Sequence, residues 1–167
     1  MSTPLKQHYD SALIVGSTAP TLCFNRSEGK LTLSSQERNS LIDAKLFSIQ
    51  DSVNKELQSY LSLKPGWDGY SASTFDENAV LLAQHIADFS VLFLRDERIL
   101  PHEITPGPVG DGTIDLEISC KGKNLIFTVA PDVKEIQVFK DDSIARKEEV
   151  IPFETTSLGK ELNWLVD

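Results

Sequence analysis

The chain has 167 residues, of which 40% are hydrophobic and 25% charged, and its 25 acidic residues outnumber 16 basic ones to give a net charge of −9. This length fits one domain and is enough to bury a core without disulfides or a structural metal. The acidic excess argues against binding to nucleic acid or to anionic membranes, because both depend on clustered Lys and Arg.

Nothing in the sequence predicts secretion or membrane insertion. The two cysteines, Cys23 and Cys120, lie far apart and form no CxxC spacing, unlike the dense cysteines of small secreted scaffolds. Residues 1–10 lack the basic and apolar regions of a signal peptide. The most apolar stretch, residues 79–94, is interrupted by polar residues and is shorter than the roughly 20 residues that span a bilayer. We therefore expect a cytoplasmic protein.

The first 33 residues are expected to form an N-terminal arm or hairpin. Two short apolar runs, residues 13–15 and 21–24, are separated by a glycine and a proline, which predicts two short strands. They would either add a hairpin to the main sheet or form an arm that docks on a partner. The remainder, residues 34–167, is expected to form a single domain.

A long amphipathic helix is predicted to begin after Ser34. Ser34 and Glu37 have the spacing of a capping box, in which each side chain bonds the backbone N–H of the other residue. Downstream, apolar residues recur every three or four positions, as they do on one face of a helix. These residues are Ile42, Leu46, Ile49, Val53, Leu57 and Tyr60. We expect the helix to run to about Leu61.

A second helix is predicted over residues 76–94. Thr74 and Glu77 have capping-box spacing, and acidic residues in a first turn are favoured by the helix dipole. The residues that follow are apolar on nearly every face, which is typical of a helix inside a core or an interface. It is expected to be the central helix or the seam of a homodimer.

From residue 100 onward the apolar residues alternate with a period of two, which predicts strands. The clearest runs are residues 113–119, 124–129 and 135–139. Because short turns join them, these strands must be antiparallel. Residues 144–153 are the candidate for a fourth strand, and residues 156–165 for a closing helix. The prolines of residues 101–108 predict a stiff connection there.

Together these elements predict an α+β fold, with two helices packed on one face of an antiparallel β-meander of three to five strands and a short C-terminal helix. The other face of the sheet would carry residues polar enough to contact solvent. These are Asp115, Glu117, Ser119 and Thr128.

The loop between the two predicted helices reads Gly66-Trp67-Asp68-Gly69-Tyr70-Ser71-Ala72. It resembles a GWDGYGA-type motif of small uncharacterised bacterial and mobile-element proteins, where a helix, a Pro-containing link, an Asp-Gly turn and an alternating strand follow. The resemblance covers about residues 62–140 and departs from the pattern at Ser71, where a glycine is usual. It implies a similar fold and carries no established chemistry.

Two interpretations of this loop stay open. In the structural one, Gly66 and Gly69 permit a tight turn, and Asp68 accepts hydrogen bonds from the backbone that follows. Trp67 and Tyr70 would then pin the loop against both helices. In the functional one, the same two aromatic residues are exposed anchors for a partner, a role in which Trp and Tyr are enriched.

Catalytic and metal sites are not predicted. Cys23 or Cys120 would need His85 or His102 as a base, but both thiols lie in apolar or strand contexts that are typical of inert cysteines. His85 is expected to be a core or interface histidine. The histidines show no metal-ligand spacing, and the glycines of residues 107–112 precede a strand, which offers no helix N-terminus to a phosphate. We expect no cofactor and no metal ion.

These observations favour a non-catalytic protein-binding module, such as an antitoxin, an immunity protein or a mobile-element inhibitor. Its acidic surface would attract a basic partner protein, which it would block sterically. The candidate partner-binding residues are Trp67, Asp68, Tyr70, Asp76 and Glu77. One alternative is a homodimeric structural or accessory subunit, joined through residues 76–94 or a sheet edge. Another is a small enzyme that uses Cys120 or His85.

Overall fold

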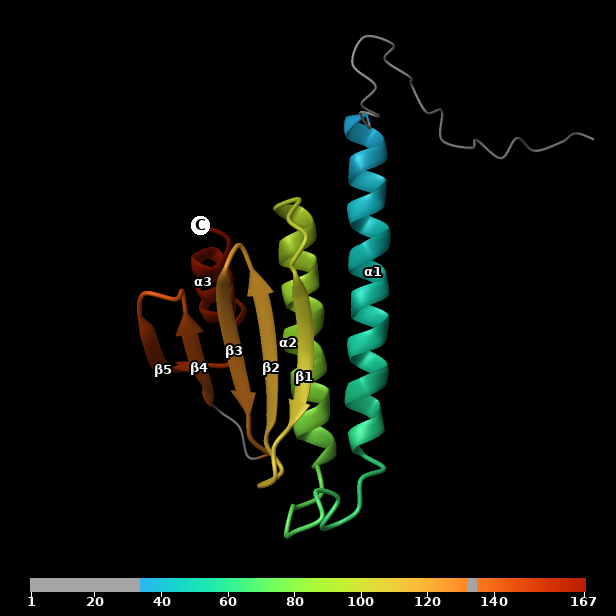
Figure 1. The fold of residues 1–167 in the computed structure, drawn as a ribbon, viewed down its shortest axis with the longest axis vertical. Helices are drawn as coiled ribbons and strands as arrows, with labels where there is room; N and C mark the ends of the chain where they lie inside the picture. Colours follow the sequence, from blue (N-terminus) through green and yellow to red (C-terminus); the bar gives the residue numbers. More distant parts are fainter. Residues whose placement is uncertain (1–33, 132–134) are drawn as a thin grey trace, which may run out of the picture.

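The structure of the chain is a computed structural model, which describes residues 34–131 and 135–167. The arm or hairpin expected from residues 1–33 lies outside the described residues. In the described part, two helices cover one face of a five-stranded antiparallel sheet, and the first helix packs beside one of them at the edge of the sheet (Figure 1). This arrangement confirms the predicted α+β class with its short C-terminal helix.

Helix α1 spans Ser35–Tyr60 and begins at the predicted cap. The Ser34 N–H donates to Glu37 Oε2 at 2.8 Å, and the Glu37 N–H donates to Ser34 Oγ at 3.3 Å. Most of the predicted apolar stripe is buried, and α1 packs against α2 and the edge of the sheet. The buried members are Leu46, Val53, Leu57 and Tyr60.

A polar layer joins the middle of α1 to α2. Gln50 Nε2 and Asn54 Nδ2 both donate to Asp88 Oδ1, at 2.6 and 3.1 Å. One turn further on, Gln58 Nε2 donates to Gln84 Oε1 at 3.0 Å. The bonds to Asp88 are half-buried and the Gln58–Gln84 bond is exposed. Because they are directional, these bonds fix how the two helices align along their lengths.

Helix α2, Glu77–Asp96, is the central helix and packs against α1, β2, β3 and α3. Its N-cap is Asp76, whose carboxylate accepts the Asn78 N–H at 2.8 Å, so the capping box predicted at Thr74 is wrong. Because α2 has neighbours on several sides, it carries apolar residues around most of its circumference. His85, expected to be a core or interface histidine, is exposed and therefore does not belong to the core. It shares a narrow strip of α2 with Leu81 and Leu92, which are 43% and 44% exposed.

The five strands pair in sequence order, each antiparallel to the next. They are β1 (Glu103–Pro108), β2 (Ile114–Cys120), β3 (Lys123–Val129), β4 (Glu135–Asp141) and β5 (Arg146–Pro152). Strand β1 corrects the expectation of a stiff connection over residues 101–108. Two prolines are tolerated in it because it is an edge strand. The Tyr60 hydroxyl donates to the Pro106 carbonyl at 2.9 Å and ties α1 to this edge.

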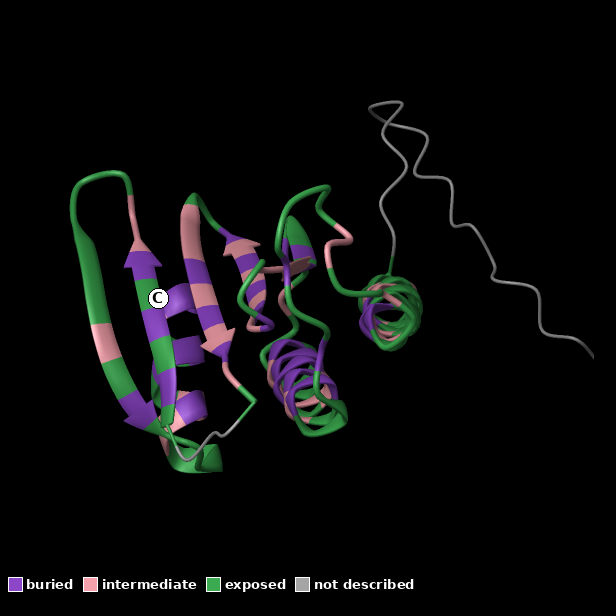
Figure 2. Cartoon of the chain, turned by 90° about the horizontal axis from the view of Figure 1, so that it is seen from below, coloured by how far each residue is buried: buried purple, intermediate pink, exposed green. Residues whose placement is uncertain are grey.

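Buried and less buried residues alternate along the strands (Figure 2). On one face Leu116 lies opposite Phe127, which lies opposite Val138, and all three are fully buried beneath the helices. Helix α3, Thr155–Val166, packs on β3 from the same side. The residues between the buried ones form the other face, which these helices leave uncovered and which we call the open face.

Candidate functional site

The loop at residues 66–72 is held by its own hydrogen bonds. Gly66 and Gly69 have φ angles of +74° and +84°, which side-chain-bearing residues rarely adopt. Asp68 Oδ1 accepts the N–H groups of Tyr70 and Ala72, at 2.8 and 3.2 Å. The loop therefore contains the Asx-type turn that the sequence predicts at Asp68.

The two aromatic residues of this loop have different environments. Trp67 packs against the core, with its ring centroid 5.9 Å from that of Phe75, and its Nε1 donates to the Ser73 carbonyl at 3.1 Å. Tyr70 is 90% exposed. Trp67 thus matches the structural interpretation, whereas Tyr70 has the exposure that the functional interpretation requires.

The same loop also packs on the turn between β1 and β2. The Ser73 N–H donates to the Gly110 carbonyl at 2.8 Å. Gly112, with φ +90°, lies so close to Thr74 that a Cβ atom at this position would come within 3.0 Å of the Thr74 carbonyl oxygen. The glycine-rich loop and the Asp-Gly turn therefore form one structural joint between the helices and the sheet.

The remaining predicted site residues lie beside this joint. Asp68 and Glu77 are exposed, and Asp76 is exposed but uses its carboxylate as the α2 cap. Of the five predicted partner-binding residues, Trp67 contributes to packing, and Asp68 and Asp76 bond the local backbone. Tyr70 and Glu77 carry side chains for which no hydrogen bond is found within the described residues.

A concentration of acidic side chains lies elsewhere, on the open face of the sheet. The pairing registers place six carboxylates and one guanidinium on this face, a net charge of −5. The acidic residues are Glu103, Asp115, Glu117, Glu135, Asp141 and Glu148, and the basic residue is Arg146. Side chains on one face of neighbouring strands lie close together, so their potentials add.

Apolar side chains interrupt this acidic surface near its middle. Ile126 lies directly opposite Phe139 in the β3–β4 register, and Phe139 in turn lies opposite Glu148 of β5. Phe139 is 37% exposed and Val150 is 54% exposed. A hollow of about 490 Å³ is lined by Ile126, Phe139 and the charged residues beside them.

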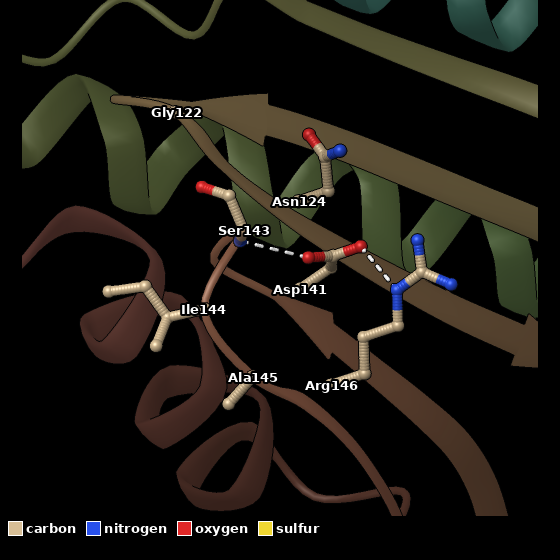
Figure 3. Close-up of a pocket in the computed structure, with 7 residues that line it drawn as sticks. All are labelled: Gly122, Asn124, Asp141, Ser143, Ile144, Ala145 and Arg146. Carbon is tan, nitrogen blue, oxygen red and sulfur yellow. Dashed lines mark hydrogen bonds and ion pairs between the residues drawn. The ribbon is translucent and has the colours of Figure 1, made fainter.

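A second hollow, of about 470 Å³, lies where the β2–β3 and β4–β5 turns meet (Figure 3). Asp141 is central to it, because one carboxylate oxygen accepts the Ser143 N–H and the other accepts Arg146 Nε, each at 2.9 Å. Ile144, at the tip of the turn, is 94% exposed. Asp141 and Arg146 line both hollows, so the two hollows lie next to each other over β3, β4 and β5.

Cys120 is buried at the end of β2, and burial raises the pKa of its thiol, which disfavours the reactive thiolate. His85 and His102 are exposed. Cys23 lies outside the described residues. Within residues 34–131 and 135–167, His, Cys, Asp and Glu side chains form no group of three that could hold a metal ion.

Comparison with protein-family models, with curated proteins and with solved structures gives no match. Among the described helices, none combines the length and the apolar character needed to cross a membrane. A function must therefore be argued from the geometry and charge of this chain.

The open face could be anticipated only in part. The alternation of Asp115 and Glu117 with apolar residues indicates a polar face from the sequence alone. That Glu103, Asp141 and Glu148 share this face depends on β1 being a strand and on the registers of β4 and β5. Registers are set by pairing between strands, and a slip of one residue would move every side chain to the opposite face.

Proposed function

We propose that this chain is a non-catalytic binding protein whose open face recognises a basic protein surface. The observation that supports the proposal is the net charge of −5 on one sheet face, half of the −10 carried by residues 34–167. A single-sign surface of this kind steers an oppositely charged partner and repels acidic ones.

The hollow lined by Ile126 and Phe139 supplies the apolar contact that charge alone lacks. Protein interfaces depend on a few apolar or aromatic anchors in a desolvated centre, surrounded by polar residues. Phe139 and Ile126 lie in the middle of the open face, and charged residues of both signs line the hollow around them. These are Asp141, Glu148, Lys140, Arg146 and Lys147. This arrangement fits a partner that inserts one apolar side chain into the hollow and places Lys or Arg over the carboxylates of the wider open face.

The mode of action that follows is steric. A folded partner bound across the sheet face would have its own basic surface covered, as expected of an antitoxin-like or immunity-like inhibitor. Tyr70 is a separate candidate anchor, because the loop that carries it joins the β1–β2 turn through Ser73. That turn lies at the opposite end of β2 from the hollow at Ser143.

The experiment is affinity capture from lysate of the native host at two salt concentrations, with wild type and two charge-matched variants. The open-face variant carries Glu117→Gln and Glu148→Gln, and the control carries Asp96→Asn and Glu97→Gln at the end of α2. We expect a basic protein that is retained by wild type and control, released at high salt, and lost from the open-face variant.

Equal loss from both variants would indicate that net charge alone matters and would contradict a specific open-face site. Recovery of only the chain itself, at a concentration where it dimerises, would support the homodimeric alternative instead. Tyr70→Ala in the same assay tests the loop as a second contact; Trp67→Ala is unsuitable for this purpose because it would disturb packing.

A further inference from the structure

A groove between α1 and α2 has no partner among the described residues. Its floor is formed by Leu46 and Val91, which are 1% and 4% exposed, and its rim carries Phe47 and Leu92, which are 71% and 44% exposed. The groove has a volume of about 770 Å³. An aromatic ring as exposed as Phe47 beside a second apolar residue is a common sign of a surface that another segment covers.

The groove lies at the N-terminal half of α1. In Figure 1 this end of α1 projects beyond α2 and the sheet. One ion pair, Arg98 Nη1 to Asp43 Oδ1 at 3.2 Å, spans from the end of α2 to α1. Towards the N-terminus, α1 exposes Leu41 as well, at 46%. The unpartnered surface therefore lies close to the point where residues 1–33 join the helix.

We propose that residues 21–24 of the same chain dock in this groove. Leu22 and Phe24 are its apolar residues, and in an extended segment residues two positions apart point to the same side. Both side chains could then contact the groove while Cys23 points away from it. The proposal concerns how the arm packs and does not depend on the proposed function.

The connecting chain is long enough for this contact. Nine residues, 25–33, separate the segment from Ser34, and nine extended residues reach about 30 Å. The groove begins at Asp43, eight residues into α1 and thus about 12 Å along its axis. The segment can therefore fold back along α1 and reach both rim residues.

Charge and tethering favour this occupant over a second copy of the chain. Residues 1–33 carry three basic and two acidic side chains, a net charge of +1, whereas residues 34–167 carry −10. Two whole chains, each at −9, would repel each other. A segment on a short tether is also present at an effective concentration of about millimolar.

The test uses the full-length chain with Cys120→Ala, so that a nitroxide spin label attaches to Cys23 alone. Amide signals are then recorded by NMR with the label oxidised and reduced. We expect the oxidised label to broaden the amides of residues 43–50 and 91–98. The amides of β5 serve as the control region. In the double variant Leu22→Ser/Phe24→Ser, and separately in Phe47→Ser, the broadening of residues 43–50 and 91–98 should fall to the level seen for β5.

Leu13→Ser is the matched control for an apolar residue elsewhere in the arm and should leave the broadening unchanged. Equal broadening in wild type and in the Leu22→Ser/Phe24→Ser variant would overturn the proposal. Mixing spin-labelled chain with isotope-labelled, spin-free chain identifies the source of any contact. Broadening in this mixture would assign the groove to a second copy and would also overturn the proposal.

Discussion

Trp67 and Tyr70 lie three positions apart in one loop, but the backbone turn at Asp68 sends them into different surroundings. Trp67 contacts the core and donates to the Ser73 carbonyl, whereas Tyr70 is 90% exposed. We expect Trp67→Ala to lower the free energy of unfolding by about 2–3 kcal/mol, below the cost for a fully buried ring. Tyr70→Ala should change it by less than about 0.5 kcal/mol.

Urea denaturation of the two variants measures this difference. Trp67→Phe serves as the control that keeps a ring and removes the indole N–H, so it should lose less than Trp67→Ala. If Tyr70→Ala proved the more destabilising variant, the exposed position of its ring would be contradicted.

Two glycines with positive φ provide a second comparison at the residue scale. A Cβ at Gly69, φ +84°, would meet no atom within 4 Å, whereas at Gly112, φ +90°, it would approach the Thr74 carbonyl oxygen to 3.0 Å. Gly69→Ala should cost about 1 kcal/mol through backbone strain alone. Gly112→Ala should cost at least about 1 kcal/mol more, because of crowding. Thermal unfolding of the two variants checks which one loses more stability. Equal losses of stability would exclude close packing of the joint.

At the scale of elements, a buried ion cluster joins β4 to its neighbouring strand β5 and to helix α3. Lys140 of β4 points to the helix side, where it pairs with Glu149 of β5 and with Glu161 of α3. Its Nζ also lies 5.6 Å from the centroid of the Trp164 ring. Glu161 is 1% exposed, so its charge depends on Lys140 for compensation.

Removing Lys140 should therefore cost more than removing the pair. We expect Lys140→Met to lower the free energy of unfolding by about 3–5 kcal/mol, because it leaves buried carboxylate without a partner. The double variant Lys140→Met/Glu161→Leu should recover most of this loss, since packed apolar side chains often replace a buried ion pair without cost. A double-mutant cycle by urea denaturation measures the coupling. Additive losses would contradict a direct pair.

The same cluster predicts a pH dependence. Hydrogen bonds from Lys140 and Lys147 lower the pKa of the Glu149 carboxyl from 4.5 to about 2. A carboxyl with a depressed pKa stabilises the fold above its unfolded pKa and loses that contribution as the pH falls. Stability should therefore decrease between about pH 4.5 and 2. Glu149→Gln should show a shallower decrease in the denaturation midpoint over that range, and an identical slope would contradict the assignment.

At the scale of the whole molecule, one continuous core joins all three helices to the sheet. It includes residues from α1, α2, α3 and every strand. A chain that begins at Ser34 is accordingly expected to unfold in one cooperative transition. If residues 21–24 occupy the α1–α2 groove, this shortened chain should be less stable than the full chain. Calorimetry tests both points, and separate transitions for α1 and the sheet would contradict a single core.

Local patterns were sufficient to predict most elements. The capping box at Ser34 and the apolar stripe through Leu57 located α1, and strict alternation located β2, β3 and β4. One prediction failed because a neighbouring strand decided the outcome: β1 forms despite Pro106 because it lies at the sheet edge. Tertiary contacts also decide that His85 is outside the core, because the elements around α2 leave one strip of it uncovered.

The α+β class, the order of the elements and the acidic excess follow from local sequence, because periodicity, caps and composition depend on residues close together in the chain. The turn at Asp68 follows from it as well. Three features depend on tertiary contacts instead. The carboxylates of β1, β2, β4 and β5 share one face, Trp67 is packed while Tyr70 is exposed, and Phe47 borders an uncovered groove. These features depend on strand register and helix packing, which are set by contacts between residues far apart in sequence.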